Sequence, residues 1–139
     1  MTDLGLTHVA FSVRDLDAST AFYVKYAGMA AVHSRAGDGV RVAWLTDHTR
    51  PFVIVLIEAA NRHDTPLGPS GHLGVACASR GDVDRLCALA EAEGRLRKAA
   101  SDSGPPVGYW AFIADPDGNT LELSHGQEVG LTVAGAEPR

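Results

Sequence analysis

The sequence predicts an α+β fold of two βαβββ modules that form a curved mixed sheet around a metal-binding cleft. Three observations lead to this prediction. The order strand, helix and three strands occurs twice along the 139 residues. Each module has a His on its first strand and a Glu on its last strand. Corresponding residues lie 64 positions apart in both cases, His8 to His72 and Glu58 to Glu122.

The first module is expected over residues 4–60. Alternation of apolar and polar residues predicts a strand over 7–13. Asp15 and Asp17 predict the start of a helix that continues to about Ala27, and Gly28 is a typical helix stop. Strands are then predicted at about 30–35, 40–46 and 52–58, because Gly-, Asp- and Pro-containing turns separate these segments.

The second module is expected over residues 71–126, after a linker at 61–70. It repeats the pattern with a strand over 72–77 and a helix that Asp82 opens and Gly94 ends. Three strands follow at about 95–99, 109–114 and 120–124, and the Asp-Pro-Asp-Gly turn at 115–118 joins the last two. Residues 127–139 are predicted to be a loose tail. The chain, residues 1–139, is therefore expected to be a single domain.

Composition places the chain among globular proteins, with 45% hydrophobic and 21% charged residues. The net charge of −5 is spread along the chain, which argues against nucleic acid as a partner. The longest apolar run, 52–57, is far shorter than the ~20 residues of a membrane helix, and the N-terminus does not resemble a signal peptide. Cys77 and Cys87 lack a CxxC spacing, so they are expected to be buried, reduced thiols of a cytoplasmic protein.

The two His and two Glu residues form a mixed nitrogen and oxygen ligand set. Such a set suits one Ni, Co, Zn, Mn or Fe(II) ion and is too rich in nitrogen for Ca or Mg. Taken singly, each residue has an ordinary structural interpretation, as a hydrogen-bonded His or a solvated Glu. The equal spacing of His8, Glu58, His72 and Glu122 is what favours a shared metal site.

Strand alternation predicts which side chains accompany these ligands. Small residues follow His8 and His72 on their faces, which leaves room in front of the sheet. The predicted substrate pocket contains Ser12, Phe52, Ile54, Leu56, Arg62, Trp110 and Phe112. The other histidines are not expected to be ligands: His33, His48 and His63 fall at strand ends or in loops, and His125 has the opposite parity from Glu122.

The segment from His8 to Val13, followed by Ser19, Phe22-Tyr23 and Gly28-Met29, resembles the N-terminal signature of glyoxalase I (lactoylglutathione lyase). From about residue 6 to 125 the chain is similar to the vicinal oxygen chelate superfamily. That group includes glyoxalase I, extradiol dioxygenases, fosfomycin-modifying enzymes, methylmalonyl-CoA epimerase and bleomycin resistance proteins. Glyoxalase I also uses the four-ligand pattern found here.

This resemblance implies a divalent-metal-dependent lyase or isomerase that acts on a small substrate with adjacent oxygens through an enediolate. Glu122 is then the expected catalytic base and Glu58 its pseudo-symmetric partner, while His8 and His72 anchor the ion. It also implies a homodimer, with a small-molecule substrate as the other partner.

Three positions depart from the patterns of the relatives. Ser12 and Arg62 stand where glyoxalase I usually has an Arg and an Asn, and Phe112 stands where extradiol and fosfomycin-modifying enzymes have a Tyr. Two alternative functions therefore remain. One is a metal-independent, bleomycin resistance-like protein that sequesters a drug on apolar residues such as Trp110. The other is an Fe- or Mn-dependent dioxygenase, which would consume oxygen.

Overall fold

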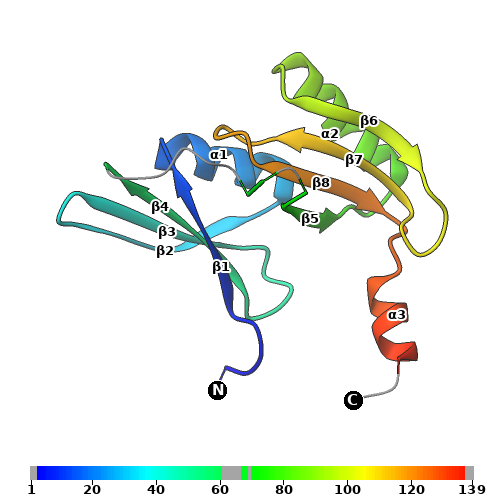
Figure 1. The fold of residues 1–139 in the computed structure, drawn as a ribbon, viewed down its shortest axis with the longest axis horizontal. Coiled ribbons are helices and arrows are strands. Elements are labelled where there is room, and N and C mark those ends of the chain that lie inside the picture. The colour runs from blue at the N-terminus through cyan, green and yellow to red at the C-terminus, as the bar shows by residue number, and fades with distance from the viewer. Residues whose placement is uncertain (1–2, 61–66, 69, 137–139) are drawn as a thin grey trace. The chain divides into compact units, whose positions relative to one another are not determined.

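The computed structural model describes residues 3–60, 67–68 and 70–136. The chain divides into two compact units, residues 1–66 and 67–139, and each contains one four-stranded sheet (Figure 1). Unit 1 consists of β1 (His8–Val13), α1 (Leu16–Ala27), β2 (Ala30–Gly37), β3 (Val40–Thr46) and β4 (Val53–Ala59). Unit 2 consists of β5 (His72–Ala76), α2 (Arg80–Ala92), β6 (Leu96–Asp102), β7 (Tyr109–Ala114), β8 (Thr120–His125) and α3 (Val129–Gly135). The predicted α+β fold with two βαβββ modules is confirmed.

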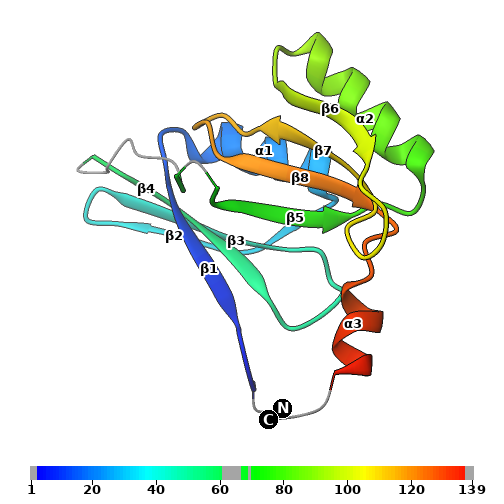
Figure 2. The same cartoon turned by 45° about the vertical axis from the view of Figure 1, so that its right-hand side comes forward.

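The two sheets have the same mixed topology. In unit 1 the strand order is β1-β4-β3-β2, and in unit 2 it is β5-β8-β7-β6. The first strand of each unit pairs in parallel with the last strand of the module, β1 with β4 and β5 with β8, and the remaining pairs are antiparallel (Figure 2). A parallel pair requires a long crossover, which the helix and two intervening strands provide.

The first helix of each unit packs on its own sheet, and its ends follow from local chemistry. The Asp15 side chain accepts a hydrogen bond from the Ala18 N–H (3.1 Å), and Gly28 closes α1 at a φ of 63°. Helix α2 begins two residues before the predicted Asp82, because Ser79 is the N-cap and accepts from the Asp82 N–H (3.1 Å).

One face of each sheet is apolar and covered by the helix. In unit 1, α1 contacts β3 and β4, whose side chains Leu45, Ile54 and Leu56 are at most 2% exposed. In unit 2, α2 contacts β6, β7 and β8, where Ile113 and Leu121 are fully buried. Each such side chain stabilises its unit by about 1.5–3 kcal/mol. The opposite face of each sheet carries His8 in unit 1 and His72 and Glu122 in unit 2.

The predicted loose tail contains a helix. In α3 none of the residues is buried, and the Glu128 N–H just before it donates to the Pro106 carbonyl (2.8 Å). The tail thus forms a helix although none of its described side chains is buried. A prediction based on the burial of apolar residues does not reveal such a helix. No helix within the described ranges is long and apolar enough to cross a membrane.

Candidate functional site

In unit 2, the sheet places His72 and Glu122 side by side. His72 lies opposite Thr120 on the parallel strand, and Gly74 lies opposite Glu122. Glu122 is therefore two positions further along the strand pair, on the same face as His72 because side chains alternate with period 2. The His72 Nε2 and Glu122 Oε1 atoms are 3.6 Å apart.

Hydrogen bonds orient both side chains. The Nδ1 of His72 lies 2.8 Å from the Ser70 carbonyl oxygen. A carbonyl can only accept, so Nδ1 carries the hydrogen and, in the neutral ring, Nε2 keeps a free lone pair toward Glu122. The other oxygen of Glu122, Oε2, accepts from Gln127 Nε2 (3.0 Å). Glu122 itself is buried, at 9% exposure.

This pair fits a divalent metal. Two ligand atoms that are each ~2.1 Å from one ion lie about 3.0–3.5 Å apart, close to the 3.6 Å between Nε2 and Oε1. A Cβ at Gly74 would come within 3.8 Å of Glu122 Oε2, so the neighbouring strand leaves space beside the carboxylate. Within the part of the chain that the structure describes, no group of three or more His, Cys, Asp or Glu side chains is gathered for a metal.

Aromatic residues adjoin the pair. The ring of Phe112, which lies opposite Glu122 in the sheet, is 5.3 Å from His72 and 4.8 Å from Trp110. Lys98 Nζ is 3.7 Å from the centre of the Trp110 ring, a cation–π contact. Phe112 and Trp110 were predicted pocket residues and do share the face of His72. Sequence reasoning missed Gln127 and Lys98: Gln127 lies in the predicted tail, and Lys98 reads as an ordinary strand-surface residue.

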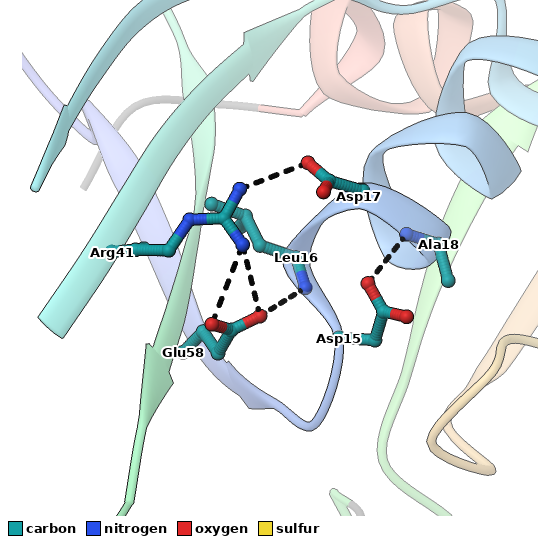
Figure 3. A network of polar contacts seen from close by, with 6 residues as sticks. All are labelled: Asp15, Leu16, Asp17, Ala18, Arg41 and Glu58. Atoms are coloured by element: carbon teal, nitrogen blue, oxygen red, sulfur yellow. Dashed lines mark hydrogen bonds and ion pairs between the residues drawn. The ribbon is translucent and has the colours of Figure 1, made fainter. Parts of the chain in front are cut away.

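In unit 1, Glu58 does not accompany His8, and this corrects the predicted ligand set. His8 lies opposite Val53, whereas Glu58 lies opposite Val13 at the other end of β1. The Glu58 carboxylate accepts from the Leu16 N–H at the start of α1 (2.7 Å) and lies 3.4 Å from Arg41 Nη1. Figure 3 shows this network, in which Arg41 also pairs with Asp17 (3.0 Å). Glu58 therefore stabilises the helix start.

Cross-strand register explains why equal spacing along the chain misled the prediction. The residue opposite His8 comes 45 positions later, whereas the residue opposite His72 comes 48 positions later. The position that corresponds to Glu122 is the one opposite the second residue after His8, and Val55 occupies it. Among the described residues of unit 1, the cross-strand position beside His8 thus carries no carboxylate.

His8 lines a cavity of about 730 Å³ on the open face of unit 1. Its other lining residues are Asp3, Thr7, Ala10, Val32, Arg35, Trp44, Thr46, His48, Arg50, Pro51, Phe52, Val53, Val55 and Ile57. Among the predicted pocket residues, Phe52 lines this cavity. Ile54 and Leu56 do not, because their side chains point under α1, and Ser12 is exposed outside it. Arg62 lies outside the described residues.

The remaining histidines and the cysteines have structural neighbours. The His33 ring packs at a tilt against Trp44 (4.8 Å between ring centres), and His125 Nδ1 lies 3.0 Å from the Cys77 carbonyl. His48 lines the cavity of unit 1, and His63 lies outside the described residues. Burial is the first cause that raises the pKa of both free thiols, Cys77 and Cys87.

Comparison with known families agrees with this fold. The model of the Glyoxalase/Bleomycin resistance protein/Dioxygenase superfamily matches residues 5–123. The chain belongs to this superfamily. An uncharacterized protein of Pseudomonas aeruginosa is 39% identical over 127 residues, which cover 90% of this chain and 91% of the relative.

Solved structures show the same fold. A glyoxylase/bleomycin resistance protein/dioxygenase domain from Frankia sp. EAN1pec is 25% identical with a TM-score of 0.71, over 90% of this chain and 99% of that one. Glyoxalase I from Zea mays is 24% identical with a TM-score of 0.68, over 85% of this chain and 43% of that one. A mutant of the fosfomycin resistance protein FosX from Listeria monocytogenes, complexed with Mn(II) and 1S,2S-dihydroxypropylphosphonic acid, is 18% identical with a TM-score of 0.68, over 95% of this chain and 99% of that one.

Proposed function

We propose that this protein is a divalent-metal-dependent enzyme that acts on a small substrate with two adjacent oxygens. The observation that carries the proposal is the His72–Glu122 pair, with its two donor atoms 3.6 Å apart and hydrogen bonds that orient both side chains. The proposed ligands are His72, Glu122 and His8. The family resemblance, and not a contact in the structure, adds His8 to the pair.

The proposed reaction is a lyase or isomerase reaction of the glyoxalase I type. When bound, the metal would supply Lewis-acid polarisation of the substrate's adjacent oxygens. Glu122 would act as the base that moves a proton between neighbouring carbons. Its orientation supports this role, because Gln127 holds Oε2 while Oε1 faces His72. The Ser70 carbonyl would hold the His72 ring through its Nδ1–H, so the lone pair of Nε2 stays available to bind a metal.

The loss of Glu58 from the ligand set changes what the metal must be. Three protein ligands leave only one open position on a tetrahedral ion but three on an octahedral ion. A substrate that binds through two oxygens needs two positions. The proposal therefore favours Ni, Co, Mn or Fe(II) over a four-coordinate Zn.

The same three residues favour a second candidate, a dioxygenase. Two His and one carboxylate with open positions are the ligand set of many non-haem Fe(II) oxygenases. The two candidates differ in oxygen use: a dioxygenase with Fe(II) or Mn(II) would consume oxygen, whereas an isomerase or lyase would not.

Metal content and turnover together test the proposal. Purified chain is stripped, reconstituted with each of Ni, Co, Zn, Mn and Fe(II), dialysed and analysed for bound metal. Methylglyoxal with glutathione is the first substrate for turnover, and an oxygen electrode follows catechol turnover. We expect one metal per site in the native chain and in Glu58→Ala, with loss of tight binding in His72→Ala and Glu122→Ala. A folded native chain that retains no metal would contradict the proposal and leave drug sequestration as the function.

A further inference from the structure

We infer that the cavity of unit 1 binds an organic anion with an apolar body, and that Arg35 binds its anionic group. The inference rests on the proposed function only in placing the reacting end of the ligand near His8. It concerns the substrate class of this chain.

The floor of the cavity is apolar and continuous. Trp44 and Ala10 both lie opposite Val55, so these three side chains form one row across β3, β4 and β1. Ile57 and Val53 flank this row along β4. A volume of about 730 Å³ is typical of a pocket that holds a small organic molecule, and an exposed Trp provides a flat surface for a ring or chain.

Two arginines, Arg35 and Arg50, and one carboxylate, Asp3, line the same cavity. Among the described residues, neither guanidinium has a carboxylate within 4.0 Å. Arg41 provides the contrast, because it pairs with Asp17 and Glu58 at the helix start. In a chain with a net charge of −5, two arginines without carboxylate partners outnumber Asp3 in this cavity, and this excess of positive charge favours an anionic ligand.

Arg35 is the better anion anchor of the two. Its Nη1 lies 3.2 Å from His33 Nε2. Arg can only donate, so His33 accepts in this contact and brings no negative charge to Arg35, which leaves the charge of Arg35 uncompensated. Arg50 lies in the field of Asp47, whose pKa is lowered first by Thr49 and also by Arg50. The acidic neighbour offsets part of the charge of Arg50.

The cross-strand register of unit 1 indicates how far apart the two ends of the ligand lie. Arg35 lies opposite Val42, which lies opposite Ile57, and this row is two residues from the Trp44 row. At ~3.4 Å per residue, an anion at Arg35 lies about 7 Å along the strands from a ring on Trp44. His8 lies opposite Val53, four residues from Ile57 and thus about 14 Å from the Arg35 row. The apolar body therefore lies between the anionic end and His8.

The test uses full-length ¹⁵N-labelled protein in the presence of a chelator, so that it is independent of any metal. The chain has two Trp residues, and Trp44→Phe assigns their indole N–H signals. The ligands are 4-phenylbutanoate and the uncharged 4-phenylbutanamide. We expect the carboxylate to shift the Trp44 signal and to bind about ten-fold or more tightly than the amide, since a hydrogen-bonded charge pair is lost with the amide.

Matched variants identify the anchor. Arg35→Gln should remove the preference for the carboxylate, and Arg35→Lys should retain part of it. Arg85→Gln removes the same charge from the exposed surface of α2 and should leave the preference unchanged. Circular dichroism shows whether each variant is folded.

Four results would overturn the inference. Equal affinity for the acid and the amide would show that the anion is not recognised. Loss of the preference in Arg50→Gln, but not in Arg35→Gln, would show that Arg50 binds the anion and that Arg35 does not. A Trp44 signal that responds to protein dilution, and to neither ligand, would mean that a second copy covers this face. If the Trp44 signal responded neither to the ligands nor to dilution, the cavity would not bind an organic anion of this class. Failure of metal binding would affect none of these readouts.

Discussion

Removal of the Glu58 carboxylate tests whether this residue is a metal ligand or a structural residue. In the structure it accepts from the Leu16 N–H (2.7 Å), one of the N-terminal amides of α1 without a partner in the helix, and it lies beside Arg41. The Glu58 side chain is 28% exposed and that of Arg41 is 44% exposed. Solvent therefore screens the ion pair more than the bond to the helix.

The expected loss of stability follows from these two contacts. A carboxylate on a free helix N–H contributes about 1–2 kcal/mol, as an N-cap does, and a largely exposed ion pair adds about 0–1 kcal/mol. Glu58→Ala should therefore lower the free energy of unfolding by about 2 kcal/mol. For a chain of this length that corresponds to a decrease in Tm of about 5–8 °C. Glu58→Gln keeps an oxygen for Leu16 and should lose about half as much.

The assay compares thermal unfolding with metal content in the same samples. Glu91→Ala removes one exposed carboxylate from α2 and serves as the control, with an expected change in Tm near zero. Glu58→Ala should keep the metal stoichiometry of the native chain, whereas Glu122→Ala should lose it. If Glu58→Ala keeps its Tm and loses its metal, the register argument is refuted and the four-ligand set is restored.

Three further perturbations concern unit 2. Gln127→Ala removes the hydrogen-bond donor to Glu122 Oε2 (3.0 Å) and should weaken metal binding by about 10–100-fold. Chelator competition measures this affinity, and an unchanged value would exclude this role of Gln127. Gly74→Ala should keep its metal, since its Cβ would meet Glu122 at an ordinary 3.8 Å, while Gly74→Val should lose it in the same assay; retention in both would argue against a confined site. The raised pKa of Cys77 and Cys87 means that both thiols stay protonated at pH values where an ordinary thiol, with a pKa of about 8.5, ionises. Their alkylation by iodoacetamide should be slow at pH 8 and should accelerate only at higher pH or in denaturant; rates at pH 8 equal to those of a free Cys would contradict this.

The sequence predicted the fold well because the relevant signals are local. Alternation in the first strand, the Asp15 cap and the Gly28 stop are encoded by adjacent residues, and the structure places strands and helices there. Boundaries moved where a different residue supplied the cap. Helix α2 begins at Arg80 with Ser79 as its N-cap, instead of at Asp82, since Ser and Asp both cap well.

The candidate site was harder to predict because register is not local. In β4 every residue from Val53 to Ile57 is apolar, so alternation does not distinguish the two faces of this strand. Positions counted along the chain then took the place of cross-strand pairing, which depends on loop lengths. As a result Glu58, Ile54 and Leu56 were assigned to the open face. In β8 the polar Glu122 among leucines marked its face clearly, and that assignment agrees with the register.

The three-residue difference in register gives the open faces of the two sheets different side chains at the same position. Val55 lies opposite Ala10 in unit 1, whereas Glu122 lies opposite Gly74 in unit 2. In the proposed site, unit 1 then supplies only His8, and the rest of its open face is left for contacts with the substrate. Chemistry and choice of substrate can thus evolve on separate copies of the same architecture. Val55→Glu, rather than any change at Glu58, is the single substitution that would give unit 1 a carboxylate at the position that Glu122 occupies in unit 2.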